Sequence, residues 1–161
     1  MPGYISITDN EWCENQRRAN PDYAVFWRKR LAFRAIKPGE TFYFLKRSPI
    51  NGERCLVGKA TYVNSCEKEF EDAWNAYGSK LGVSSREAFE QKVNSIYKER
   101  DVKLGCIILN NLIFLEKAIP LSKCGIDFSP YIVSGKTIDE QSCKKVDTIF
   151  AEEAEERGQK Q

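Results

Sequence analysis

Aromatic and basic residues stand side by side in three segments of the chain. These segments are residues 26–30 (Phe-Trp-Arg-Lys-Arg), 42–47 (Phe-Tyr-Phe-Leu-Lys-Arg) and 131–136 (Tyr-Ile-Val-Ser-Gly-Lys). An aromatic face can stack on an unpaired base while cationic groups around it hold phosphates. We therefore expect nucleic-acid binding. The alternative for each segment is a strand whose apolar side faces the core and whose charges face water.

The expected site residues fall into a base-binding and a phosphate-binding group. Trp27 leads the first group because it stands in an irregular, basic segment and not on a periodic helix face. Glycines inside strand-like runs often mark a bulge or a close approach of ligand or backbone. The predicted base pocket comprises Trp27, Ser48, Gly58, Tyr62, Tyr131 and Gly135, and the predicted phosphate-binding residues are Arg28, Arg30, Arg34, Lys46, Arg47, Lys59 and Lys136.

Charge is unevenly distributed along the chain. The formal net charge is +2, but residues 1–60 hold eleven Lys and Arg against six Asp and Glu, whereas the remainder holds fourteen against seventeen. Basic residues that share a face attract a phosphate backbone. A solvated surface is the equally acceptable alternative.

The sequence offers no convincing catalytic or metal-binding constellation. It contains no histidine, which excludes histidine-dependent catalysis by this chain and removes the commonest metal ligand. Its six cysteines are scattered singly, so we interpret them as reduced core thiols. No phosphate-binding glycine loop occurs. We therefore expect neither an enzyme nor a bound cofactor.

Length and composition indicate a single globular domain. With 161 residues and 42% hydrophobic residues, the chain can bury a sizeable core. No apolar run is long enough to span a membrane, and the N-terminal segment does not resemble a secretory signal. We expect a cytoplasmic domain over residues 1–150 and a charged tail over residues 151–161.

Capping patterns and apolar spacing predict the helices. Capping boxes begin at Thr8, Ser84 and Thr137, and each precedes a run with helical periodicity. A further helix is expected over residues 70–77, because its apolar residues recur at helical spacing and Gly78 ends the pattern. The last helix has an apolar face formed by Val146, Ile149 and Phe150.

The β-rich runs predict about five strands joined by hairpins. Residues 42–47 and 55–63 flank a turn at Asn51-Gly52, and residues 104–109 and 112–115 flank a second turn at Asn110-Asn111. Residues 131–136 return to β character, while residues 23–27 fit either a strand or an extended loop. We predict an α+β domain with a mostly antiparallel, barrel-like sheet and helices inserted between its strands.

Seven segments carry a resemblance to a known family, in order through nearly the whole chain. They are residues 8–12, 26–27, 33–46, 56–58, 73–74 with 77–78, 105–109 and 132–137. Together they resemble the N-terminal domain of HNH restriction endonucleases, a PUA-like module akin to EVE and ASCH domains.

This resemblance implies a PUA-like β-barrel with inserted and flanking helices. It also implies a reader that holds a flipped, modified DNA base in an aromatic and basic pocket, as the specificity module of a modification-dependent restriction system. An HNH site needs histidine, so the nuclease is expected on another domain or on a partner. Two alternatives stay open: an RNA-binding module of the same class, and an ASCH-like enzyme that acts on modified nucleosides through Lys59 or Lys136 and a nearby acid.

Overall fold

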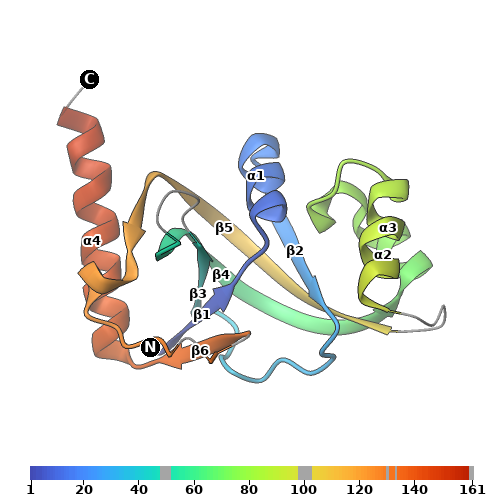
Figure 1. Ribbon diagram of the computed structural model, residues 1–161, viewed down its shortest axis with the longest axis horizontal. Coiled ribbons are helices and arrows are strands. Elements are labelled where there is room, and N and C mark those ends of the chain that lie inside the picture. Colours follow the sequence, from blue (N-terminus) through green and yellow to red (C-terminus); the bar gives the residue numbers. More distant parts are fainter. Residues whose placement is uncertain (48–51, 98–102, 130, 133, 160–161) are drawn as a thin grey trace.

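One six-stranded sheet runs through the molecule and carries helices at both ends (Figure 1). The computed structural model describes residues 1–47, 52–97, 103–129, 131–132 and 134–159. The strands are β1 (Gly3–Ile7), β2 (Tyr23–Arg28), β3 (Thr41–Arg47), β4 (Arg54–Glu69), β5 (Lys103–Pro120) and β6 (Gly135–Ile138). The helices are α1 (Asn10–Ala19), α2 (Phe70–Tyr77), α3 (Arg86–Ile96) and α4 (Glu140–Gln159), with 3-10 turns η1 (Gly78–Leu81) and η2 (Leu121–Cys124).

The sheet is open, with the strand order β2-β5-β4-β3-β1-β6. All neighbouring strands are antiparallel except β1 and β3, which are parallel. The predicted α+β class and PUA-like architecture agree with this arrangement, but the expected closed barrel is wrong. Among the described residues β2 pairs only with β5, and the four-residue β6 pairs only with β1, so the edge strands do not meet. Phe33, in the segment after β2, packs against β1, with its ring 5.1 Å from the ring of Tyr4.

Strand β1 was not expected from the sequence, yet it connects the edge strand β6 to β3 and so to the rest of the sheet. Its backbone pairs Tyr4 with Phe42 of β3 on one side and with Thr137 of β6 on the other. Strand β6 begins at Gly135, later than the predicted 131–136 run. The segment at residues 23–27, which fitted a strand or a loop, is strand β2.

The predicted hairpin at Asn110-Asn111 is wrong, because β5 runs through both asparagines without reversing. Asn111 has a positive φ of 51°, which the turn prediction also required. Here the left-handed residue lies where the β4–β5 register shifts between the pairs Lys59–Ile113 and Thr61–Asn110. Such a shift inserts an extra residue and bends the strand, so the local conformation predicted for Asn111 produces a β-bulge.

Helices α2 and α3 form a lobe on the far ends of β4 and β5, as Figure 1 shows. The prediction of helix 70–77 is confirmed, and Gly78 ends it with φ 53°. The rings of Phe70 and Trp74 stack on Phe89 of α3 at 4.9 and 6.2 Å. Trp74 therefore has the packing role that its helical spacing indicated.

The predicted helix caps are displaced toward the C-terminus. The cap of α1 is Asp9 and not Thr8, and the cap of α3 is Ser85 and not Ser84. At α4, Asp139 accepts a hydrogen bond from the backbone N–H of Ser142 at 2.8 Å, while Thr137 still belongs to β6. Each segment offers several capping residues in succession, and the sequence pattern alone does not choose between them.

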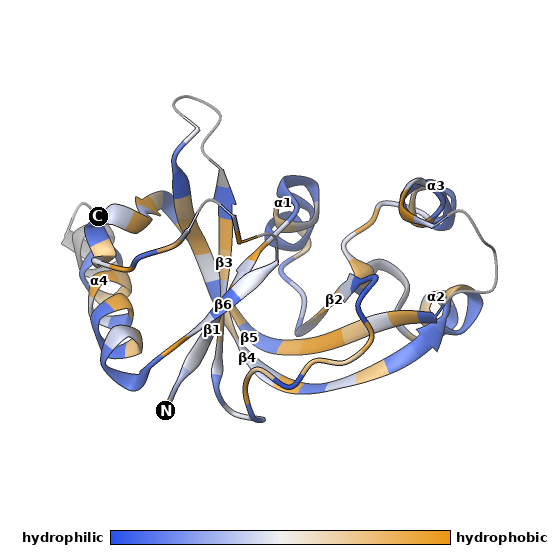
Figure 2. Cartoon of the chain, turned by 60° about the horizontal axis from the view of Figure 1, so that its bottom comes forward, coloured by the Kyte–Doolittle hydropathy of each residue, from blue (hydrophilic) through white to orange (hydrophobic). Residues whose placement is uncertain are grey.

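Helix α4 covers the sheet at the end opposite the lobe. Val146 and Phe150 are buried against it and Ile149 packs beside them, which confirms the predicted apolar face. The helix continues to Gln159 and so includes most of the expected tail. Figure 2 shows the orange, hydrophobic face of α4 together with its blue, hydrophilic residues.

Among the described residues, the helices are too short or too polar to cross a membrane. All six cysteines are free thiols, and five of them are buried. This agrees with the interpretation of the cysteines as reduced thiols in the core.

Candidate functional site

Alternation along β2 separates Trp27 from Arg28, which were predicted to act at one nucleic-acid site, Trp27 on the base and Arg28 on the phosphates. Side chains of a strand point to opposite faces in turn. Ala24 and Phe26 accordingly belong to a cluster with the aromatic residues of β3, whereas Val25 and Trp27 belong to the core of the lobe. Arg28 follows on the Phe26 side.

Trp27 is partly buried and packs against the core of the lobe. Its ring lies 5.2 Å from that of Phe89 in an edge-to-face arrangement, and its Nε1–H donates to the carbonyl oxygen of Leu81 at 3.1 Å. The indole thus joins β2 to the α2–α3 lobe.

A pocket of about 400 Å³ lies between the two edge strands of the open sheet. One wall comes from the end of β2 and the loop after it, and the other comes from β6, with β1 between them. We call it the edge pocket. Its described lining residues are Tyr4, Arg28, Arg30, Ala32, Phe33, Arg34, Ala35, Ser134, Gly135 and Thr137. Four predicted site residues, Arg28, Arg30, Arg34 and Gly135, therefore meet here.

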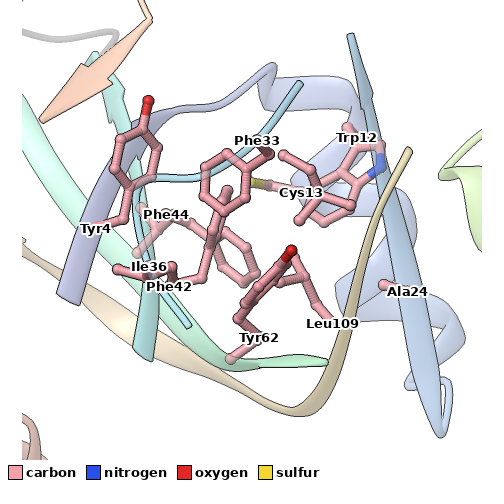
Figure 3. Close-up of a cluster of buried hydrophobic side chains, with 13 residues drawn as sticks. Tyr4, Trp12, Cys13, Ala24, Phe33, Ile36, Phe42, Phe44, Tyr62 and Leu109 are labelled. Carbon is pink, nitrogen blue, oxygen red and sulfur yellow. The ribbon is translucent and has the colours of Figure 1, made fainter. Parts of the chain in front are cut away.

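Tyr4 and Phe33 form the floor of the edge pocket and belong to the aromatic cluster beneath it. Figure 3 shows that the Tyr4 hydroxyl points away from Phe42 and Phe44. Gly135 makes room for it, since a Cβ at that position would collide with the Tyr4 hydroxyl and the Ile5 carbonyl oxygen. Both rings are almost fully buried, so the floor offers little aromatic face for stacking.

Arg28 is held in a fixed position at the pocket wall. Its Nη2 donates to the carbonyl oxygen of Ala32 at 2.7 Å, and its guanidinium carbon lies 5.1 Å from the centre of the Phe33 ring. Burial lowers the pKa of the Arg28 guanidinium below its ordinary value, while the nearby Tyr4 hydroxyl acts in the opposite direction. Its Nε–H is buried and has no partner among the described residues. Arg28 thus presents an unused donor.

Arg30 and Arg34 are exposed at the pocket, and neither makes an ion pair within the part of the chain that the structure describes. The described lining residues include no Asp or Glu. The hydroxyl-bearing Ser134 and Thr137 line the opposite wall. The arrangement can hold an anionic or hydrogen-bond-accepting group among three guanidinium groups.

Two other residues of the predicted base pocket lie in the packed sheet. Tyr62 is buried in the aromatic cluster and its hydroxyl donates to Ser65 Oγ at 3.0 Å. Gly58 lies where β4 and β5 approach closely, because a Cβ there would come within 2.6 Å of the Ile113 carbonyl oxygen. Tyr131 is 89% exposed and is not among the described lining residues. Ser48 lies outside the described residues.

Three further predicted phosphate-binding residues, Lys46, Lys59 and Lys136, are not among the described lining residues of the edge pocket. Lys46 lines a small hollow of about 50 Å³ beside Arg17, and Lys136 Nζ donates to the Asp127 carbonyl oxygen at 2.5 Å. Lys59 Nζ lies 3.1 Å from Asp147 Oδ1. The side chain of Arg47 lies outside the described part of the chain.

Lys59 and Asp147 line a second pocket, of about 200 Å³, between β5 and α4. The Tyr43 hydroxyl also donates to Asp147 Oδ1, at 2.8 Å, and the Lys59 ammonium lies 5.1 Å from the centre of the Phe150 ring. Burial, followed by the charge of Asp147, raises the pKa of the Tyr43 hydroxyl well above its ordinary value. No cluster of three or more His, Cys, Asp or Glu residues that could hold a metal occurs among the described residues.

The backbone superposes on solved structures of known name. The ASCH protein of Zymomonas mobilis superposes with a TM-score of 0.67 and 14% identity, over 91% of this chain and 94% of that one. Structures of a tyrosine-to-phenylalanine and a serine-to-alanine variant of it give the same TM-score. The chain has the ASCH fold, which is PUA-like.

A hypothetical protein of Leishmania major superposes on this chain with a TM-score of 0.55 and 12% identity, over 98% of this chain and 97% of that one. Human THYN1, solved in complex with DNA that contains 5-methylcytosine, gives a TM-score of 0.49 and 13% identity over 95% of this chain, a similarity too loose to establish a shared fold. The sequence itself matches no family model and no curated protein.

Part of the edge pocket of this ASCH fold was not predicted from the sequence. Tyr4, Ser134 and Thr137 were not among the expected site residues, although they contribute hydroxyl groups to it. The alternation of Tyr4-Ile5-Ser6-Ile7 is the signal that could have revealed β1. Nothing local to Thr137 indicates that it pairs with Tyr4.

Proposed function

We propose that this ASCH-fold chain is a non-catalytic reader that binds a modified base of DNA in the edge pocket. The observation that supports it is the gathering of Arg28, Arg30 and Arg34 around a pocket of about 400 Å³ with no acidic residue among its described lining. Pockets of this size hold small ligands. The volume suits a nucleobase, and the charge suits the nucleotide that carries it.

The arginines can serve both parts of a nucleotide. A guanidinium plane stacks on a base in the manner of an aromatic ring, which compensates for the buried faces of Tyr4 and Phe33. Exposed arginines at the mouth can contact the phosphates on either side of an extruded base. We therefore assign Arg28 to the base and Arg30 and Arg34 to the phosphates.

Fluorescence anisotropy with matched duplexes tests the proposal. The duplexes are unmodified, or carry one 5-methylcytosine, one 5-hydroxymethylcytosine or one phosphorothioate. We expect tighter binding of one modified duplex than of the unmodified one. Single-stranded RNA of the same sequence, added as competitor, identifies the RNA-binding alternative if it displaces every duplex.

Charge-removing variants connect the binding to the edge pocket. Arg30→Gln and Arg34→Gln each remove an exposed guanidinium, so we expect weaker binding and a salt slope reduced by about 1. Arg18→Gln is the matched control, because Arg18 is exposed on α1 and does not line the pocket. Equal, weak binding of all duplexes by the folded protein, with all three variants alike, contradicts the proposal.

The reader proposal includes a role as the specificity module of a modification-dependent restriction system. This part rests on the sequence resemblance. Because the chain has no histidine, an HNH nuclease has to come from another domain or subunit. Cleavage of modified plasmid by the purified chain alone contradicts this division of labour.

The Lys59–Asp147 pair favours one second candidate, an enzyme that acts on modified nucleosides. Lys59 has the nearby acid that this alternative requires, and the two residues line a pocket of about 200 Å³. Incubation with a panel of modified nucleosides tests it by chromatography. Turnover that disappears in Lys59→Met but persists in Arg30→Gln supports the enzyme, and no turnover by the folded wild-type chain contradicts it.

A further inference from the structure

The edge pocket is lined by a cationic group, the guanidinium of Arg28, whose hydrogen bonds are incomplete. Arg28 uses Nη2 for the Ala32 carbonyl and lies over the Phe33 ring, so its position is fixed before any ligand arrives. Its Nε–H is buried without a partner among the described residues. A buried donor without an acceptor is costly, and more so when it belongs to a charged group. Arg28 therefore lines the pocket with a guanidinium group whose hydrogen bonds within the described protein are incomplete.

Burial lowers the pKa of Arg28, the Tyr4 hydroxyl opposes this only in part, and no carboxylate among the described residues pairs with the guanidinium. Arg30 is close enough to disfavour the charged form of Arg28, and Arg34 adds a third guanidinium to the same pocket. No described residue forms an ion pair with Arg28. Elsewhere on the surface, cations do have acidic partners: Lys92 binds both Asp9 and Glu11, at 2.8 and 3.1 Å.

A neutral base does not compensate for the positive charge of the guanidinium groups in the edge pocket. The acceptors on a cytosine edge can take a hydrogen bond, but they carry no formal charge. An oxyanion accepts stronger, charge-assisted bonds from guanidinium groups and also relieves the repulsion between them. The hydroxyl groups of Ser134 and Thr137 on the facing wall can donate to the same oxyanion.

We propose that the edge pocket selects an oxyanion, carried on a base as a carboxylate or on a strand end as a terminal phosphate monoester, and holds it with the guanidinium groups of Arg28, Arg30 and Arg34. This inference rests on the proposed function, because it names the chemical class of nucleotide that the reader binds. A pocket of this kind is expected to bind nucleotides with charged modifications more tightly than those with neutral methyl or hydroxymethyl groups.

Two matched pairs of oligonucleotides test the proposal and distinguish the two sources of the oxyanion. One pair is a duplex with a single 5-carboxylcytosine and the same duplex with 5-methylcytosine. The other is a single strand with a 5′-phosphate and the same strand with a 5′-hydroxyl. We expect the charged member of one pair to bind at least about tenfold more tightly, measured by anisotropy at fixed salt.

Variants of Arg28 assign the preference to its guanidinium. Arg28→Gln is expected to abolish the preference, while Arg28→Lys keeps a charge without the planar fork and is expected to retain only part of it. Arg18→Gln is again the matched control and should retain the whole preference. If Arg28→Gln does not fold, the wild-type comparison within each pair still decides the question.

The inference and the proposed function fail in different ways. Equal binding within both pairs, still weakened by Arg30→Gln, overturns the oxyanion preference and leaves the reader in place. Equal binding that is indifferent to Arg30→Gln overturns both. A preference that survives in a folded Arg28→Gln variant overturns the assignment to Arg28.

Discussion

Trp27 and Arg28 are adjacent in sequence and serve different parts of the molecule. The indole closes the contact between β2 and the α2–α3 lobe, and the guanidinium forms the wall of the edge pocket. The division follows from the two-residue period of a strand. It decides which of the two residues a binding experiment should target.

Replacement of Trp27 by alanine is expected to destabilise the protein without a specific effect on binding. The change removes a large ring packed on Phe89 and leaves the Leu81 carbonyl without its donor, at a cost of about 3 kcal/mol in the free energy of unfolding. Urea denaturation measures it. Trp27→Phe keeps most of the packing and should bind oligonucleotides like the wild type, so a loss of affinity in that folded variant would place the indole in the site.

At the residue scale, the sequence predicted the local wall of the pocket and, of the distant wall, only Gly135. Arg28, Arg30 and Arg34 lie within seven positions of one another, so their shared location could be read from the chain. Tyr4 and Thr137 become neighbours only through the pairing of β1 with β6. Only the order of strands in the sheet, which no local pattern encodes, reveals that wall.

The bulge in β5 depends on the left-handed conformation of Asn111. Asparagine and glycine adopt positive φ far more readily than β-branched residues. We expect Asn111→Gly to be nearly neutral and Asn111→Val to lower the free energy of unfolding by about 1–2 kcal/mol. Thermal unfolding of the two variants tests this, and equal stability would show that the bulge does not require φ 51° at this position.

The start of α4 depends on an ionised cap. Hydrogen bonds from the backbone and side chain of Ser142 lower the pKa of Asp139. A lowered pKa means that ionised Asp139 stabilises the fold above its ordinary value of about 3.9, and that this contribution is lost as the pH falls through the folded value. Asp139→Ala should therefore lower the Tm at pH 7 and differ less from the wild type at pH 3.

Asp139→Asn is the matched control for this cap. Asparagine also accepts from the backbone N–H, but it does not titrate. We expect it to unfold close to the wild type at pH 7. A difference between Asp139→Ala and wild type that is the same at both pH values would show that the charge of Asp139 is unimportant.

At the scale of elements, the spacing of apolar residues predicted the helix α2 correctly, whereas the turn signal at Asn110-Asn111 did not predict the course of the chain. The spacing of Phe70, Trp74 and Tyr77 predicted α2 because burial of one helix face imposes it. Asn110-Asn111 fits a hairpin and a bulge equally well, since both use the same dihedral angles. The structure has a bulge because β5 continues past the two asparagines. Pairing with β4 before and after them, and with β2 before them, holds the strand in this course.

At the scale of the whole molecule, the fold protects its thiols from reaction. Burial raises the pKa of Cys13 and of Cys106 to about 12, so few molecules carry the reactive thiolate near neutral pH. Only Cys66 of the six is partly exposed. We expect iodoacetamide at pH 8 to label at most one cysteine in the native protein and all six in urea, as measured by mass spectrometry. Rapid labelling of several native cysteines would show that the core opens readily.

The position of β1 between β3 and β6 has a consequence for how ligand binding and folding are coupled. The two walls of the edge pocket come from segments separated by most of the chain, so a ligand held by both acts as a noncovalent cross-link. Strand β6 has four residues and lies on an outer edge, where local opening costs least. Release of β6 would remove one wall of the pocket, so we expect a bound ligand to slow amide exchange in β6 more than in β4 or β5. On this view, the docking of the short strand β6 controls whether the chain can bind.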